Sequence, residues 1–258
     1  MRTLALLPVV LAVAAAVAPE GWADRASGGE AAAAASHVSF RAADGVEVFA
    51  DLYLSGEAKS GPLILLFHQA GSNAGEYEPI APRLVDLGFS CLAVDQRSGG
   101  RRWDRNNRTV LRLGRSEDFA AAYTDLETAL MWARRQGWTG PVLAWGSSYS
   151  AALVFRLASE YPEVSAVLSF SPGEYLGEGT PVRNWASKVS VPVYATSAGG
   201  REVTATRSIV DAVASPHKSQ YVARVGVHGS STLRADRNPG GYEENWRAVT
   251  AFLRAPGP

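Results

Sequence analysis

The chain alternates short apolar runs with segments of helical periodicity. The runs are too continuous to leave one face in water, which predicts buried parallel strands; they cover residues 63–67, 89–94, 142–145, 164–170, 191–196 and 221–227. Ahead of them, residues 38–40 and 46–54 alternate apolar and polar side chains around Asp44 and Gly45, which predicts an antiparallel hairpin.

Helical patterns lie between these runs, at residues 76–87, 117–136, 149–160, 203–214 and 242–253. A hairpin followed by alternating strands and helices predicts an α/β fold of three layers with a mostly parallel sheet. In such a sheet the ligand site lies beyond the carboxyl ends of the strands.

The first residues have the features of a secretory signal peptide. Arg2 precedes an apolar stretch over residues 4–18, and the small residues Gly21 and Ala23 predict cleavage after Ala23. The alternative is a buried or membrane-spanning helix, for which the apolar stretch is short. We therefore expect an exported protein, periplasmic or secreted, with a signal peptide at 1–23, a flexible spacer at 24–35 and one domain at 36–258.

Composition narrows the range of partners. Lysines and arginines number 25 and acidic residues 25, and no basic stripe suggests nucleic acid, so the arginine-rich segment 97–108 is interpreted as a solvated loop. The single cysteine, Cys91, lies in an apolar run and is interpreted as a small buried hydrophobe. Neither a Cys/His cluster nor a phosphate-binding glycine loop is present, so we expect no metal and no cofactor. We also expect a small-molecule substrate and no stable membrane span after leader removal.

The segment from Gly146 to Ser150 carries the most specific chemistry. It stands between an apolar run and a helical pattern, the context in which a G-x-S-x-G nucleophile elbow exposes a serine, here Ser148. Gly146 satisfies the need for a small residue two positions before the nucleophile, and Ser150 stands where the motif has its second glycine. Ser147 as nucleophile would place Trp145 at the crowded position, whereas Ser150 remains a weaker alternative.

Other polar residues follow the predicted strands. Gln69 comes after the strand ending at residue 67, Glu202 after the strand ending at 196, and His228 after the last strand. The order serine, acid, histidine is that of the α/β-hydrolases. With the motifs at residues 67–72, 94–100, 146–150 and 227–229, nearly the whole mature chain resembles an α/β-hydrolase of the dienelactone-hydrolase-like branch.

The resemblance implies roles for these residues. His228 would take the proton of Ser148, and Glu202 would be the triad acid, although the family commonly has an aspartate there and Glu202 could instead favour a helix N-terminus. The N–H groups of Gln69 and Tyr149 would form the oxyanion hole. His68 and Asp95 would organise their loops.

We expect a serine-dependent carboxylic ester hydrolase with a shallow pocket, because residues 170–191 are too few for a large cap. A serine peptidase or an acyltransferase could use the same triad. An inactive α/β-hydrolase acting as a binding module is a further alternative. The sequence leaves the acyl group, the leaving group and the oligomeric state open.

Overall fold

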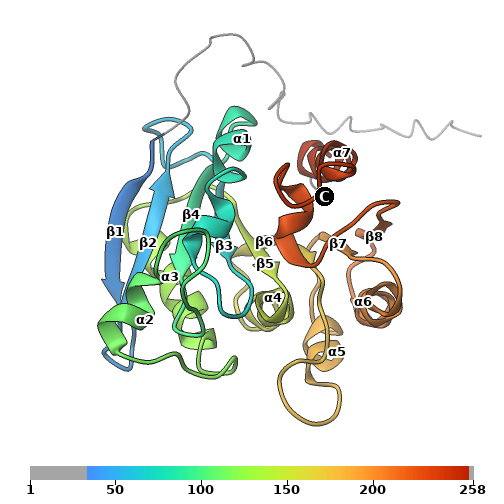
Figure 1. Ribbon diagram of the computed structural model, residues 1–258, viewed down its shortest axis with the longest axis horizontal. Helices are drawn as coiled ribbons and strands as arrows, with labels where there is room; N and C mark the ends of the chain where they lie inside the picture. The colour runs from blue at the N-terminus through green and yellow to red at the C-terminus, as the bar shows by residue number, and fades with distance from the viewer. Residues whose placement is uncertain (1–33, 256–258) are drawn as a thin grey trace, which may run out of the picture.

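The computed structural model describes residues 34–255, so the predicted signal peptide and most of the spacer lie outside the described residues. Eight strands form one sheet (Figure 1): β1 (Ser36–Arg41), β2 (Glu47–Tyr53), β3 (Leu63–Phe67), β4 (Ser90–Asp95), β5 (Val142–Ser147), β6 (Val164–Phe170), β7 (Val193–Ser197) and β8 (Lys218–Val222).

The strands lie in the order β1-β2-β4-β3-β5-β6-β7-β8. β2 is antiparallel to both β1 and β4, which confirms the hairpin, and the pairs from β4 through β3 to β8 are parallel. The carboxyl ends of the parallel strands therefore meet at one edge of the sheet, where the chain can bring loops from distant parts of the sequence together.

Helices cover both faces of the sheet (Figure 1). They are α1 (Ala81–Asp86), α2 (Arg108–Leu113), α3 (Tyr123–Arg135), α4 (Tyr149–Glu160), α5 (Pro181–Ala186), α6 (Arg201–Ala212) and α7 (Tyr242–Arg254), with 3-10 turns η1 (Ala74–Tyr77) and η2 (Gly229–Leu233). One buried cluster joins the sheet to α3, α4 and α6, and a second joins it to α1 and α7. The predicted three-layer α/β arrangement is confirmed.

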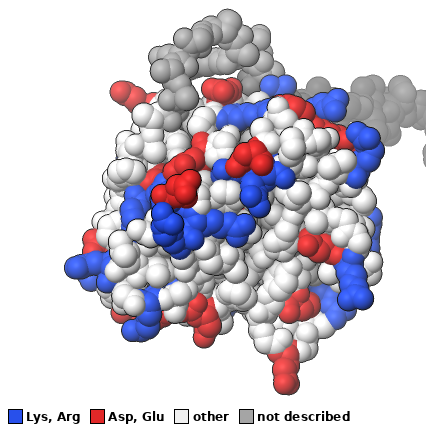
Figure 2. All heavy atoms as spheres, in the orientation of Figure 1, with Lys and Arg blue, Asp and Glu red and all other residues white. Residues whose placement is uncertain are grey.

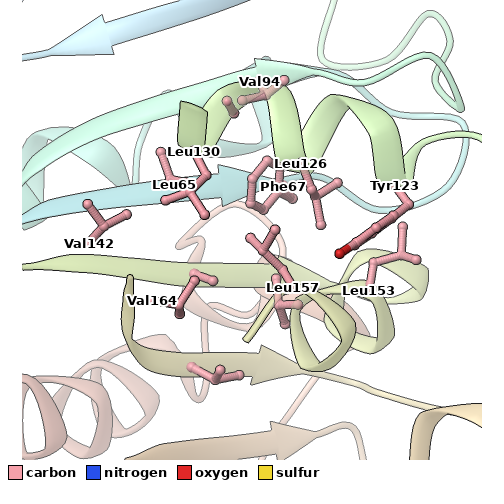
Figure 3. Close-up of a cluster of buried hydrophobic side chains, with 14 of the residues drawn as sticks. Leu65, Phe67, Val94, Tyr123, Leu126, Leu130, Val142, Leu153, Leu157 and Val164 are labelled. Carbon is pink, nitrogen blue, oxygen red and sulfur yellow. The ribbon is translucent and has the colours of Figure 1, made fainter. Parts of the chain in front are cut away.

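The strand β3 shows why its run is apolar throughout. Leu65 and Phe67 pack in the cluster shared with α3 and α4, whereas Ile64 and Leu66 pack in the cluster shared with α1 and α7. Figure 3 shows the first cluster, in which side chains of β3 face those of α3 and α4. Both faces of this strand are dry, and each such side chain stabilises the fold by about 1.5–3 kcal/mol.

Three predicted elements differ from the structure by several residues. The helix expected at 117–136 is shorter and is α3, which begins at Tyr123. The helix expected at 76–87 is a 3-10 turn followed by the shorter α1, because Pro79 and Pro82 lack the N–H that a continuous helix would use. The last strand covers Lys218–Val222 rather than 221–227, and it is partly exposed because β8 lies at the sheet edge. His228 therefore follows a loop and directly precedes η2, as its N-cap residue.

The interpretation of residues 97–108 as a solvated loop is wrong for Arg97, Arg105 and Arg108, although Arg101 in the same loop is exposed. Arg97 is buried and pairs with Asp44 and with Asp125, the latter at 2.8 Å, and Arg105 and Arg108 pair with buried Asp51 at 2.9 and 2.8 Å. These arginines fix loops instead of exposing charge. On the face shown in Figure 2, basic and acidic side chains are interspersed, as expected for a chain without a basic stripe.

Cys91 is fully buried, which confirms its interpretation as a small hydrophobe, and burial raises the pKa of its thiol. Between residues 34 and 255 no helix is long and apolar enough to cross a membrane. In the same range no group of three His, Cys, Asp or Glu residues could hold a metal ion.

Candidate active site

The turn between β5 and α4 has the strained geometry of a nucleophile elbow. Ser148 adopts φ 60° and ψ −121°, a conformation that is costly for a residue with a side chain. A Cβ at Gly146 would collide with the carbonyl oxygen of Ser150, so this position accepts only glycine without a backbone shift. The sequence requirement for a small residue here thus has a direct steric cause.

Ser148, His228 and Glu202 are brought together by this fold. The Oγ of Ser148 lies 2.8 Å from Nε2 of His228, and Nδ1 of His228 lies 2.9 Å from Oε1 of Glu202. When the Nδ1–H donates to the carboxylate, Nε2 is left to accept the proton of the serine hydroxyl. This arrangement has the geometry that a nucleophile, its base and an orienting acid require.

The electrostatics of the pair agree with this geometry. The hydrogen bond to Glu202 raises the pKa of His228 above its ordinary value, against the opposing effect of burial. In return, the hydrogen bond to His228 lowers the pKa of Glu202. The carboxylate is therefore ionised at neutral pH and favours the imidazolium that forms when the serine is deprotonated.

Glu202 lies in the first turn of α6, the place that a helix dipole also favours. Its side chain nevertheless turns to the histidine with Oε1, while Oε2 accepts the Ala198 N–H at 3.2 Å. Ser171 hydrogen-bonds to the same carboxylate, and its Oγ accepts the Gly229 N–H at 3.0 Å. Ser171 thus ties the acid to the loop that carries the histidine.

The other two serines of the elbow point away from His228. Ser147 donates to Oε1 of Glu76 at 2.8 Å, and Ser150 donates to the His68 carbonyl at 2.7 Å. Both hydroxyls are buried in these hydrogen bonds. The geometry therefore favours the register with Ser148 over the alternatives with Ser147 and Ser150.

The two N–H groups expected to form an oxyanion hole differ in availability. Tyr149 is the first residue of α4, so its N–H has no acceptor within the helix. The Gln69 N–H, in contrast, donates to Oε2 of buried Glu76 at 2.9 Å. The prediction for Gln69 does not agree with this structure, because its N–H is already occupied.

His68 and Asp95 have the loop-organising contacts that were predicted. The Nδ1 of His68 bonds to the Gln69 carbonyl at 2.8 Å, and its Nε2 accepts the Gln96 N–H at 3.0 Å. His68 is fully buried, and this burial lowers its pKa, so the ring is neutral. Asp95 accepts the Ala74 N–H at 2.7 Å and bonds to Arg108 at 2.7 Å.

Sequence reasoning missed Ser171 and Glu76. Ser171 directly follows β6 and adopts a positive φ of 58°, so the rule that site residues follow strands could have identified it. Glu76 is the first residue of the segment 76–87, which was expected to be an ordinary helix. Nothing in the local pattern indicates that this carboxyl turns inward.

A family model described as "Serine aminopeptidase, S33" matches residues 58–228, which include the elbow and end at the histidine. No curated protein matches the sequence significantly.

Several solved structures share the fold. An esterase of Pyrococcus furiosus superposes with a TM-score of 0.69 at 16% identity, covering 90% of this chain and 96% of the esterase. A dienelactone hydrolase of Anabaena variabilis has a TM-score of 0.68 at 15% identity, covering 88% of this chain and 100% of the other. An acylaminoacyl peptidase of Pyrococcus horikoshii has a TM-score of 0.63 at 14% identity, covering 86% of this chain but 41% of the peptidase.

Proposed function

We propose that this chain, which belongs to the α/β-hydrolase family whose model is described as serine aminopeptidase, S33, is an exported serine hydrolase. Its reaction is cleavage of a carboxylic ester or a related acyl bond through Ser148, His228 and Glu202. The observation that carries the proposal is the continuous hydrogen-bond path from the Ser148 hydroxyl through His228 to Glu202, at 2.8 and 2.9 Å.

In the proposed reaction, the Oγ of Ser148 attacks the acyl carbon while Nε2 of His228 takes its proton. The imidazolium, stabilised by Glu202, then gives this proton to the leaving oxygen, and the acyl group remains on the serine as an ester. Water, deprotonated by the same histidine, attacks the acyl-enzyme and releases the carboxylic acid. The serine regains its proton from the histidine, so the cycle closes.

For the oxyanion that develops in each step, we propose the N–H groups of Tyr149 and Ala70. Ala70 follows Gln69 directly, and among the bonds of residues 34–255 its N–H has no acceptor. A free backbone donor on the loop after β3, together with the first N–H of the helix after the elbow, is what such a hole requires, and each donor is worth about 3 kcal/mol in the transition state.

Reaction with a fluorophosphonate followed by peptide mapping tests the proposal. The adduct is expected on Ser148, since this serine alone in the elbow is hydrogen-bonded to His228. Heat-denatured protein is the control and should not react. Adduct on Ser147 or Ser150 would refute the register, and complete absence of labelling would favour the inactive binding module.

The activity should depend on pH through His228. The ring must be neutral to accept the serine proton, and Glu202 raises its pKa above the ordinary value of about 6.5. We therefore expect kcat/KM for an activated ester to fall as pH decreases through a midpoint above 6.5. A pH profile of kcat/KM gives this midpoint, and a midpoint well below about 6 would contradict the assignment of His228 as base.

A serine peptidase is the second candidate, because the matching family model is described as an aminopeptidase. The triad and the proposed oxyanion hole would serve an amide equally well, so the leaving group must be tested directly. Comparing kcat/KM for a short-chain nitrophenyl ester with that for an aminoacyl nitroanilide decides between the two. A preference for the anilide would favour the peptidase.

Export is supported by the sequence of residues 1–23 alone. A mature chain beginning at Asp24 is expected, because Gly21 and Ala23 meet the small-residue requirement of signal peptidase. N-terminal sequencing of protein recovered outside the cytoplasm identifies the first residue of the mature chain. An intact Met1, or a start well beyond Ser36, would count against the assignment.

A further inference from the structure

Glu76 is a carboxyl group that the proposed reaction does not use, and it lies buried beside the proposed site. Its exposed fraction is 0%, in the 3-10 turn η1. Carboxylates are seldom buried without partners, because removal from water penalises the charged form. The hydrogen-bond partners of Glu76 therefore indicate the role of this buried carboxyl group.

Three donors converge on Glu76. Its Oε2 accepts the Gln69 N–H at 2.9 Å, and its Oε1 accepts the Gln69 side-chain amide at 2.9 Å and the Ser147 hydroxyl at 2.8 Å. Burial raises the pKa of this carboxyl, while the hydrogen bonds from Gln69 and Ser147 oppose that effect. Both oxygens accept, as in an ionised carboxylate.

The hydrogen bonds continue into the loop that carries His228. Ser147 accepts the Ser230 N–H at 2.9 Å, and the Gln69 amide also donates to the Ser231 hydroxyl at 3.2 Å. A Cβ at Gly229 would collide with Ser147 Oγ, so the histidine loop packs directly on this network. Glu76 thus joins the loop after β3, the elbow and the histidine loop.

The turn that carries Glu76 is itself firmly held. Nη1 of Arg234 donates to the carbonyl oxygens of Gly75 and Glu76 at 3.0 and 3.1 Å. The same guanidinium stacks on Trp103, 3.9 Å from the ring centroid. A fixed carboxylate can therefore impose its geometry on the groups that bond to it.

We propose that Glu76 is a positioning residue of the active site, whose buried carboxylate holds the Gln69 N–H inward and fixes the elbow against the histidine loop. Holding Gln69 in this way leaves the next N–H, that of Ala70, as the donor for the oxyanion. This inference rests on the proposed function, because it assigns Glu76 a role in the same reaction.

Glu76 also acts on His228 through its charge. The charged groups whose electrostatic effects reach the ring are Glu202 on α6, which contacts it, Glu76 on η1 and Arg102 in the loop after β4. Glu202 raises the pKa of His228 most, Glu76 raises it further, and Arg102 opposes both. Glu76 therefore helps to stabilise the imidazolium that forms when Ser148 attacks.

The test compares Glu76→Gln with Glu78→Gln in the full chain. Glu78 lies two residues away, is half exposed and pairs with Arg105 at 2.7 Å, so it is a matched control. For Glu76→Gln we expect kcat for an activated ester to fall by up to about 10²-fold, with KM nearly unchanged. An NMR titration should show a lower pKa for His228, whereas Glu78→Gln should change neither quantity.

Thermal unfolding shows whether each variant is folded. If Glu76→Gln does not fold, Ser147→Ala replaces it, because this change removes one donor from the carboxylate and the link to Ser230; a loss of kcat at constant KM is again expected. A folded variant with unchanged kcat and an unchanged pKa of His228 overturns the role of Glu76. Failure of the proposed function looks different, since wild-type protein would then show neither turnover nor labelling of Ser148.

Discussion

Replacing Ser148 with alanine is expected to lower kcat for an activated short-chain ester by a factor of about 10⁶. The Oγ of Ser148 is the atom within 2.8 Å of His228 Nε2, and without it no acyl-enzyme can form. The substrate should still bind, because the proposed oxyanion donors are backbone groups. KM is therefore expected to change little.

The control for this variant is Ser159→Ala. Ser159 lies on the same helix, α4, and its hydroxyl bonds to the Arg156 carbonyl at 2.8 Å, away from the histidine. Its replacement should leave kcat within about twofold, since surface changes away from the site have small effects. Ser148→Ala that retains a substantial part of the wild-type kcat in a folded protein would remove this serine from the reaction.

The sheet could be predicted because its strands are buried. Residues 63–67 and 164–170 match β3 and β6 to the residue, since a strand covered on both faces reads as one apolar run. The edge strand β8 was misplaced because it lacks this burial. Its residues are partly exposed, so the apolar run at 221–227 reflects the loop toward His228 as much as the strand.

The site could be predicted where a residue's position follows from a strand end. Each of the three predicted site residues, Ser148, Glu202 and His228, lies in the chain after the carboxyl end of a strand. The structure brings their side chains into one hydrogen-bonded path. The direction of an individual backbone N–H has no such signature. Gln69 was expected to face the substrate, yet its N–H faces Glu76, because a carboxylate seven residues later returns beneath the loop.

Buried polar contacts between distant segments could not be read from the chain. Arg97 belongs to a segment that is rich in arginine and resembles a solvated loop, but Asp125, on α3, meets it in the interior. Such pairs depend on the tertiary fold, because burial of a charge is tolerated only where its partner arrives from elsewhere.

Glu202→Gln should also have a large effect, with a loss of kcat approaching about 10⁴-fold, as for replacement of the triad acid in other serine hydrolases. The glutamate uses both oxygens, Oε1 toward His228 and Oε2 toward the Ala198 N–H. A glutamine has a single oxygen, and the Ala198 N–H needs it. The amide NH₂ would then face Nδ1, forcing the proton onto Nε2, where the ring can no longer accept from Ser148.

The residual activity of Glu202→Gln should have a distinct pH dependence. Loss of the hydrogen bond from His228 Nδ1–H to the carboxylate removes the largest influence that raises the pKa of His228, so the acid midpoint of kcat/KM should move to lower pH. Asp211→Asn is the control, because this carboxylate is exposed on the same helix, α6, and should change neither kcat nor the midpoint. Near-complete retention of kcat by Glu202→Gln would exclude this glutamate as the triad acid. Its presence would then be explained by its position in the first turn of α6, where a negative charge stabilises the helix without any role in the reaction.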